Sequence, residues 1–340
     1  MRISPINKSQ IFITMGDPSG IGPEIVLKAL NKTGIWDLAV FVVIGDGRVL
    51  KETAALTDFK KNITVQNIDQ TSKNEIFLQE NALNVLDPIS VEGYFEPGKP
   101  TPLGSKKALS CLENAVYFMK NLPETEKKAL VTAPVSKEYI AEISPGFIGH
   151  TEYLRDAYLS EFVTMVMAGD AFSVVPVTRH IPIKDVAKNI NKDIIKRTLK
   201  QVCENRRLIS GKENPVIGVC ALNPHCGEGG RIGREEIDII MPAVEESKTL
   251  CDNILGPISA DTIFYYAYKK EIDIVVSMYH DQCLPPFKMV NFDQGVNLTL
   301  GLGSIRTSPD HGTAFGIAGK NTANSESMEQ AIKLALRAIG

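Results

Sequence analysis

The sequence predicts an α/β protein with a mostly parallel sheet. Short apolar runs rich in β-branched residues alternate with longer amphipathic segments, a pattern typical of β-α-β units. Several of these runs end at a cluster of Gly, Pro or polar residues, where the loops of a parallel sheet bind ligands. A chain of 340 residues is long enough for two domains, or for one large domain with a cleft.

We expect strands at the apolar runs 11–14, 39–44, 129–132, 172–177, 216–221, 272–277 and 297–300. Apolar residues at helical spacing predict a helix at 25–30 and a closing helix at 327–339. The proline-containing stretch 94–105 is expected to form a surface loop before a helix at 106–121, and 121–128 a charged connector.

Composition and charge exclude two classes of protein. The 37 basic and 40 acidic residues give a net charge of −3, so no basic excess indicates nucleic-acid binding. The sequence contains no run of about 18 apolar residues, which a membrane-spanning helix requires. We therefore expect a soluble, cytoplasmic protein without nucleic-acid or membrane partners.

The six cysteines are scattered and include no C-x-x-C pair. This pattern predicts reduced thiols rather than a disulfide framework. Cys226 and Cys283 each lie within three residues of a histidine. Each is either a thiolate metal ligand or a small buried side chain.

The chain has five histidines, and each lies beside Gly, Pro or a carboxylate, or ends a strand. His180, His225 and His280 each follow a predicted strand, which suits a metal site with ligands from separate strands. Asp261 and Asp281 are candidates to orient the imidazoles or to accept a proton. The alternative interpretation is five unrelated histidines in the core or at helix caps.

Two glycine-rich segments lie at the ends of predicted strands. Residues 16–22 lack the spacing of a dinucleotide fingerprint or a P-loop, so we interpret them as a turn that needs close backbone approach. Residues 227–230 are expected to be a flexible loop before an acidic helix that starts near Glu235 and Glu236.

Lys288, Asn297 and Arg306 follow the His280 loop at wide spacing. If they converge, a Lys, an amide and an Arg suit a phosphoryl or carboxylate group, which Arg can bind with two parallel hydrogen bonds. Taken singly, each is more often part of a solvated surface than of a binding site.

Together these motifs resemble the 4-hydroxythreonine-4-phosphate dehydrogenase family of pyridoxal phosphate biosynthesis. The resemblance covers nearly the whole chain in order and is specific. It rests on the segments GDPSGIGPE (16–24), GHTE (149–152), NPHCGEGG (223–230), YHDQ (279–282), GVNLTLGL (295–302) and IRTSPDHGTA (305–314).

The resemblance implies two α/β/α domains like those of isopropylmalate and isocitrate dehydrogenases, with the active site in an interdomain cleft at a dimer interface. We place the domains at 1–140 plus 295–340 and at 141–294. The implied homodimer shares its active sites, because His280 would complete the partner's metal site.

The resemblance also implies the roles of individual residues. A divalent metal (Zn, Mg or Co) would bind His180, His225 and His280. NAD or NADP would bind a loop at 308–320, and Asp261, Asp281 and Lys288 would lie at the reacting centre, the general base being open between the two aspartates and a metal-bound water. Substrate would bind His150, Thr151, Lys288, Asn297 and Arg306, and the cofactor His311, Gly312, Thr313, Ala314 and Gly316.

The chain departs from the family pattern at three positions. Gly316 stands where an acidic residue is usual, which predicts weak discrimination between NAD and NADP, since nothing there repels the 2′-phosphate. Cys283 replaces Gly or Ala, and Gly303 replaces Pro.

The implied reaction is NAD(P)-dependent oxidation of 4-phosphooxy-L-threonine to 2-amino-3-oxo-4-phosphooxybutanoate, which decarboxylates to 3-amino-2-oxopropyl phosphate. Two alternatives are open. One is a sister dehydrogenase acting on phosphothreonate, phosphoerythronate or a dihydrodiol. The other is a non-oxidative protein of the same fold, such as an acyl-phosphate transferase or a ligand-binding regulator.

Overall fold

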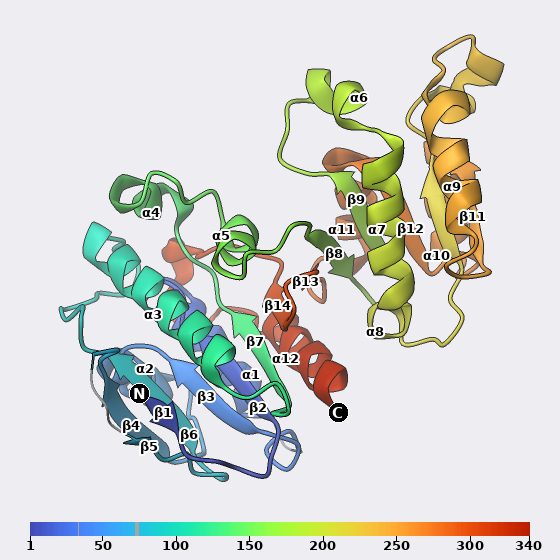
Figure 1. Ribbon diagram of the computed structural model, residues 1–340. Coiled ribbons are helices and arrows are strands. Elements are labelled where there is room, and N and C mark those ends of the chain that lie inside the picture. The colour runs from blue at the N-terminus through green and yellow to red at the C-terminus, as the bar shows by residue number, and fades with distance from the viewer. Residues whose placement is uncertain (33, 72–74) are drawn as a thin grey trace. The chain divides into compact units, whose positions relative to one another are not determined.

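The computed structural model describes residues 1–32, 34–71 and 75–340, which form two compact units (Figure 1). Unit 1 comprises Met1–Ser160 and Leu302–Gly340, and unit 2 comprises Glu161–Gly301. The chain thus passes between units at 160/161 and 301/302, rather than at the expected 140/141 and 294/295. As a result, His150 and Thr151 belong to unit 1.

Unit 1 is built on a parallel sheet. Its strand order is β14-β7-β2-β3-β6-β4, and each neighbouring pair is parallel. The central strands are buried along their whole length, as expected for a parallel sheet covered on both faces. The strands are β2 (Gln10–Thr14), β3 (Val40–Ile44), β4 (Ile63–Ile68), β6 (Leu83–Pro88), β7 (Lys128–Thr132) and β14 (Ile305–Pro309). Two short strands, β1 (Arg2–Ile3) and β5 (Glu75–Ile76), form a separate pair.

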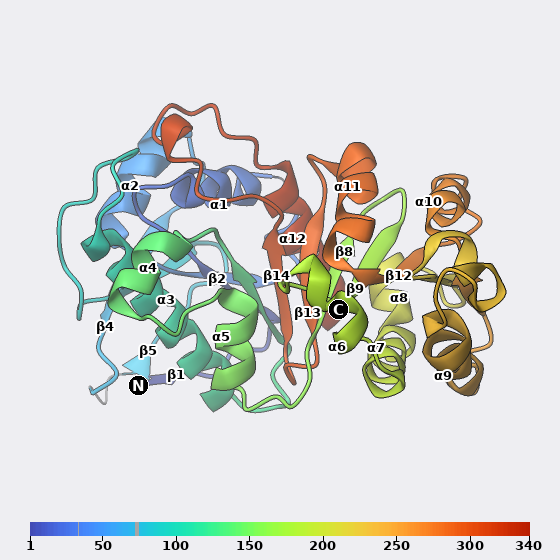
Figure 2. The ribbon, with the colours of Figure 1, turned by 90° about the horizontal axis from the view of Figure 1, so that it is seen from above.

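Helices cover both faces of this sheet (Figure 2). Helix α3 (Pro102–Asn121) packs on one face, and α1 (Gly22–Leu30), α2 (Gly47–Leu56) and α12 (Glu326–Ile339) lie on the other. Helix α3 starts four residues before the predicted 106, because Thr101 caps it by accepting a hydrogen bond from Gly104 N (3.1 Å) and Pro102 suits the first turn. The predicted end of the loop 94–105 is therefore wrong, because residues 102–105 belong to the helix. Two shorter helices, α4 (Lys137–Ile143) and α5 (His150–Ala157), follow β7.

Unit 2 has a mixed sheet in the order β11-β10-β12-β9-β8-β13. Strand β8 runs antiparallel to its neighbours β9 and β13, and the other pairs are parallel. Helices α7 and α9 lie on one face of the sheet and α10 and α11 on the other (Figure 2). The strands are β8 (Thr164–Ala168), β9 (Ser173–Thr178), β10 (Ile217–Cys220), β11 (Ile254–Ile258), β12 (Ile274–Tyr279) and β13 (Val296–Leu300). The helices are α6 (Val186–Asn189), α7 (Lys192–Glu204), α8 (Arg206–Ser210), α9 (Met241–Ser247), α10 (Ala260–Tyr268) and α11 (His280–Asn291).

The mostly parallel α/β fold and all seven predicted strands are confirmed, as is the closing helix. The five longer strands that the sequence did not predict are β4, β6, β8, β11 and β14. They carry polar residues, prolines or methionines, which interrupt the apolar runs on which the prediction relied.

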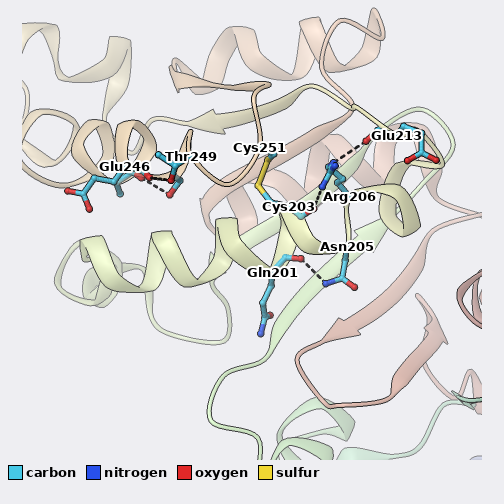
Figure 3. The surroundings of a disulfide bond; sticks show 10 residues. Gln201, Cys203, Asn205, Arg206, Glu213, Glu246, Thr249 and Cys251 are labelled. Atoms are coloured by element: carbon cyan, nitrogen blue, oxygen red, sulfur yellow. Dashed lines mark hydrogen bonds between the residues drawn. A yellow bond between two sulfur atoms is a disulfide. The ribbon is translucent and has the colours of Figure 1, made fainter. Parts of the chain in front are cut away.

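The prediction that all six cysteines are reduced thiols is wrong for two of them. Cys203 near the end of α7 and Cys251 after α9 form a disulfide, with Cα atoms 6.0 Å apart (Figure 3). The two residues are 48 positions apart, and they meet because α7 packs against α9. Spacing within the sequence gave no sign of this contact. Cys111, Cys220, Cys226 and Cys283 are free thiols.

No helix in the described part of the chain has both the length and the apolar character needed to cross a membrane.

Candidate functional site

Arg306 is the centre of a charged site in unit 1. It lies on β14 beside β7, and its side chain is buried, with 3% of the residue exposed. Its Nε and Nη2 both donate to Oγ1 of Thr132 at the end of β7, at 3.1 and 2.6 Å. Burial lowers the pKa of the guanidinium to about 10, against an opposing effect of Glu152. Arg306 therefore remains a cation at neutral pH, in a place where a free cation is costly.

His150 lies close enough to Arg306 for the guanidinium charge to affect its titration. Burial, then Arg306 and Lys137, lower the pKa of His150 well below its ordinary value, so the imidazole is neutral at pH 7. Its Nε2 atom is buried and has no hydrogen-bond partner among the described residues. An unsatisfied buried nitrogen beside a cation indicates a place for a polar ligand.

His150 and Thr151 are also the first residues of helix α5. The N-terminus of a helix presents free backbone N–H groups and a partial positive charge, which favour anions. Lys137 adds a further cation, because its Nζ lies 3.4 Å from the point that a Cβ on Gly149 would occupy. Unit 1 thus combines a buried arginine, a lysine and a helix N-terminus around His150.

In unit 2 the structure brings His180 and His280 together. They follow the neighbouring strands β9 and β12, and their ring centroids are 5.8 Å apart. Nδ1 of His280 lies 2.6 Å from Oδ1 of Asp281, so Asp281 orients this imidazole as expected. Both histidines were predicted from their positions at strand ends.

His225 lies in a turn with unusual backbone conformation. Five consecutive residues, 225–229, have left-handed φ angles between 46° and 74°, although three of them are not glycine. Each such non-glycine residue costs about 1–2 kcal/mol, and strain of this kind concentrates at functional sites. The segment that the sequence predicted as a flexible loop thus takes the form of a left-handed turn.

Glu236 holds the base of this turn. Its carboxylate is buried (1% exposed), and Oε1 accepts hydrogen bonds from Leu222 N (2.8 Å) and Asn223 N (2.7 Å). Oε2 accepts from Nδ2 of Asn223 at 2.9 Å. Glu236 begins a π-helical turn, Glu236–Ile240, rather than a simple acidic α-helix. It therefore fixes the chain that leads to His225.

No three His, Cys, Asp or Glu side chains form a metal-binding group within one copy of the described residues. Cys226 and Cys283 are the two cysteines that the sequence indicated as candidate metal ligands. Cys283 is fully buried, and burial raises the pKa of its thiol to about 12. Burial also raises the pKa of the Cys226 thiol, which contacts the carbonyl oxygen of Pro257 at 3.7 Å. These environments favour neutral thiols over thiolate ligands.

The remaining predicted residues of unit 2 lie on separate elements. Asp261 is exposed in the first turn of α10, Lys288 is half-buried on α11, and Asn297 lies on β13. Oδ1 of Asn297 is buried and has no hydrogen-bond partner among the described residues.

The predicted cofactor loop follows β14 in unit 1. Ala314 has a left-handed φ of 41°, and a short 3-10 turn spans Phe315–Ile317. A Cβ added to Gly312 or Gly316 would meet nothing within 4 Å, so open space adjoins the backbone at both positions. Lys320 Nζ donates to the carbonyl oxygen of Gly316 at 2.7 Å.

The glycine-rich turn at 16–22 supports this loop. Gly16 has a φ of 76°, and a Cβ there would lie 2.3 Å from the carbonyl oxygen of Pro134, which confirms the expected close approach. Ile21 N donates to the carbonyl oxygen of Thr313 at 2.9 Å. The turn therefore supports the cofactor loop with its backbone.

Sequence reasoning did not identify Thr132, Lys137, Glu152 or Glu236 as parts of the site. Thr132 ends a predicted strand and Lys137 follows it within the segment TAPVSK, so the strand-end argument applied to His180 could have found them.

The comparisons with known proteins agree with this fold. The family profile described as "Pyridoxal phosphate biosynthetic protein PdxA" matches residues 37–335. A 4-hydroxythreonine-4-phosphate dehydrogenase of Zymomonas mobilis is 40% identical over 328 residues, which cover 96% of this chain and 94% of that protein. The crystal structure of a 4-hydroxythreonine-4-phosphate dehydrogenase from Klebsiella pneumoniae has a TM-score of 0.79 at 33% identity, covering 98% of this chain and 100% of that one.

A β-decarboxylating dehydrogenase from Thermococcus kodakarensis is only 14% identical but has a TM-score of 0.52, covering 97% of this chain and 84% of that one, and so shares the fold. Fold and relatives together define an oxidoreductase with the α/β architecture of such dehydrogenases. More narrowly, the chain belongs to the family of the pyridoxal phosphate biosynthetic protein PdxA. The predicted family and fold class are thereby confirmed.

The low pKa of His150 predicts a pH dependence of stability. The unfolded chain takes up a proton below about pH 6.5, whereas folded His150 resists protonation, so the free energy of unfolding falls as the pH drops through that value. One such group contributes a slope of up to about 1.4 kcal/mol per pH unit. In urea titrations at about pH 7.5 and about pH 5.5, His150→Asn should lose less stability than the wild type. Equal losses would show that His150 titrates normally.

The contacts of Glu236 predict that Glu236→Gln lowers the free energy of unfolding by about 1–3 kcal/mol, because the new amide opposes the Asn223 donor. Glu245→Gln is a matched control, since Glu245 is exposed on α9 and pairs with Lys248, a contact worth about 0–1 kcal/mol. Urea denaturation of the three proteins measures the difference. Equal stability of the two variants would rule out a supporting role for Glu236.

Proposed function

We propose that the protein catalyses NAD(P)-dependent oxidation of 4-phosphooxy-L-threonine to 2-amino-3-oxo-4-phosphooxybutanoate, which decarboxylates to 3-amino-2-oxopropyl phosphate, a step of pyridoxal 5′-phosphate biosynthesis. Family membership supports this proposal. The observation that carries it is the buried cation Arg306 beside His150 and the N-terminus of α5. Such a site suits the phosphate and carboxylate groups of this substrate.

The substrate-binding residues divide by charge. Arg306 and Lys288 bind the phosphate as cations, and Thr151 and Asn297 add neutral hydrogen bonds. The guanidinium is held in one orientation by its two bonds to Thr132, which prepares it for a bidentate contact. His150 is neutral and binds the part of the substrate nearer the carboxylate through its unsatisfied Nε2.

His180, His225 and His280 are the proposed ligands of one divalent metal: Zn, Mg or Co. Neutral imidazole at strand ends is a suitable donor for such a metal. A bound divalent metal would act as a Lewis acid on the alcohol that is oxidised. We propose that the third ligand comes from a second copy of the chain, with His280 serving the partner's site.

Asp261, Asp281 and Lys288 are the proposed residues at the reacting centre. Asp281 holds the His280 ring through its 2.6 Å contact, which leaves it partly committed to orientation. Asp261 is exposed in the first turn of α10, so its carboxylate is open to solvent and to a bound substrate.

The hydride acceptor is NAD or NADP, which supplies the redox chemistry. We propose that it binds His311, Gly312, Thr313, Ala314 and Gly316. The open space beside Gly312 and Gly316 supports this assignment.

We propose a cytoplasmic homodimer that associates through unit 2. Helices α10 and α11 lie on the same face of the unit 2 sheet (Figure 2). Large apolar side chains are exposed on α10, near the end of α11 and just after it: Tyr265, Tyr268, Met289 and Phe292 are 59%, 60%, 86% and 72% exposed. Large exposed apolar side chains suit a protein interface.

A substrate panel with purified protein tests the proposed activity. We expect NADH absorbance to rise with 4-phosphooxy-L-threonine and a chelator to abolish the signal. A higher kcat/KM for phosphothreonate, phosphoerythronate or a dihydrodiol would identify the protein as a sister dehydrogenase instead. Absence of NADH or NADPH formation with every compound would contradict an oxidoreductase role for this site.

The shared metal site predicts complementation between inactive variants. His225→Ala and His280→Ala should each lose the metal and nearly all turnover. If His280 serves the partner's site, mixed subunits should recover about one quarter of wild-type activity, because half of the dimers are hybrids with one intact site. Turnover and bound metal are measured after subunit exchange has been verified by native mass spectrometry. Exchange without recovery would place all three ligands in one chain.

The fork of Arg306 predicts that Arg306→Lys raises the KM for the phosphorylated substrate about tenfold or more, because a lysine keeps the charge but not the bidentate geometry. The dephosphorylated analogue should be affected far less. Steady-state kinetics with both compounds measure this difference. An equal rise in KM for the two compounds would assign Arg306 a purely structural role.

Gly316 predicts weak cofactor discrimination. Gly316→Asp should raise the KM for NADP more than the KM for NAD, because a carboxylate repels the 2′-phosphate. A Cβ at this position meets nothing within 4 Å, so the substitution begins in open space. Initial rates with both cofactors test this on wild type and variant. Strong NAD selectivity in the wild type, unchanged by Asp, would show that another residue sets the preference.

A further inference from the structure

The glycine-rich turn holds the proposed cofactor loop through the hydrogen bond from Ile21 N to Thr313. Helix α1, which follows this turn, holds the chain just after the loop at a second point. The pair Glu24 and Lys28, spaced i and i+4 on α1, binds the backbone of residues 321–323. This stretch lies between the 3-10 turn of the loop and helix α12.

The Lys28 ammonium uses all three of its donors there. Nζ donates to Oε1 of Glu24 at 2.8 Å, to the carbonyl oxygen of Asn321 at 3.0 Å and to that of Ala323 at 3.0 Å. Oε1 of Glu24 also accepts from Ala323 N at 2.9 Å. A single ion pair therefore satisfies both the N–H and the carbonyl of Ala323.

The contacts of Glu24 and Lys28 take the place of the helix or sheet hydrogen bonds that residues 321–323 lack. Asn321 has a left-handed φ of 56°, and residues 318–325 are neither helix nor strand. Glu24 is 2% exposed and Ala323 4% exposed, so water does not satisfy these groups in place of the pair. Charge-assisted hydrogen bonds in such a buried place are stronger than neutral ones.

The pair lies beside open space. A cavity of about 130 Å³ is lined by Gly20, Glu24, Pro97 and Gly319 among others. Gly319 belongs to the proposed cofactor loop, and a Cβ there would lie 2.6 Å from Cβ of Pro97. The buried Oε2 of Glu24 has no hydrogen-bond partner among the described residues.

We propose that Glu24 and Lys28 are positioning residues that preset the loop 308–320 for the adenosine half of the dinucleotide, by holding the residues 321–323 that follow it. The inference rests on the proposed function, because it takes that loop to be the cofactor site. A loop held in its binding conformation loses less conformational entropy when the ligand binds. Removing the pair therefore weakens dinucleotide binding without touching the reacting atoms.

The test compares Lys28→Met, Glu24→Gln and Lys28→Arg with a control, Lys212→Met. Lys212 Nζ pairs with Oδ1 of Asp273 at 2.6 Å in unit 2, so the control also removes a partly buried ion pair by a Lys→Met change. Initial rates are measured with NAD varied at saturating substrate. AMP and nicotinamide mononucleotide, the two halves of NAD, are used as competitive inhibitors.

We expect Lys28→Met and Glu24→Gln to raise the KM for NAD and the inhibition constant of AMP about tenfold, with kcat and the inhibition constant of nicotinamide mononucleotide within about twofold of wild type. Lys28→Arg should recover part of the loss, and Lys212→Met should match wild type. A merely structural role would affect both halves of NAD equally.

Unchanged constants in Lys28→Met, or equal losses for AMP and nicotinamide mononucleotide, would overturn the inference and leave the proposed function intact. A wild type that neither oxidises any substrate nor binds NADH, as followed by fluorescence, would overturn the proposed function and the inference together. If Lys28→Met does not fold, the same comparison rests on Glu24→Gln, which keeps an acceptor for Ala323 N.

Discussion

The parallel direction of the strands in unit 1 is the constraint on which its functional residues depend. The register aligns Thr14 at the end of β2 with Ile44 of β3 and with Thr132 of β7. The segments that follow β2, β7 and β14 therefore leave the sheet at the same edge. Because of this shared edge, the glycine-rich turn, the segment with Lys137 and the cofactor loop are neighbours.

Unit 2 uses the same principle for a different purpose. His180, His225 and His280 follow β9, β10 and β12, which lie side by side and run parallel. The sheet alone brings two of the rings together, whereas His225 also depends on a left-handed turn held by a buried carboxylate. The two units thus offer a buried cation beside a neutral histidine in one and two adjacent imidazoles in the other.

The sequence predicted those features that depend on local pattern. Apolar runs located the central strands, and the residues after them included the three histidines. The fixed position of His225 could not be predicted, because Glu236 acts on it through backbone groups 13 and 14 residues earlier. The contact of Arg306 with Thr132 depends on the pairing of β14 with β7, across 174 residues. The disulfide likewise depends on how α7 packs against α9, which no spacing rule describes.

The return of the chain to unit 1 has a consequence for the order in which the protein folds during synthesis. Residues 161–301 form a compact unit that precedes β14 and α12 in the chain, so all of its own residues have been synthesised before those two elements. Unit 1 at that stage lacks β14 and α12, which pack against β7 and against each other. The buried arginine and the proposed cofactor loop arrive with these last elements. A nascent chain can therefore complete the surroundings of Arg306 only after the histidine-bearing unit has been synthesised.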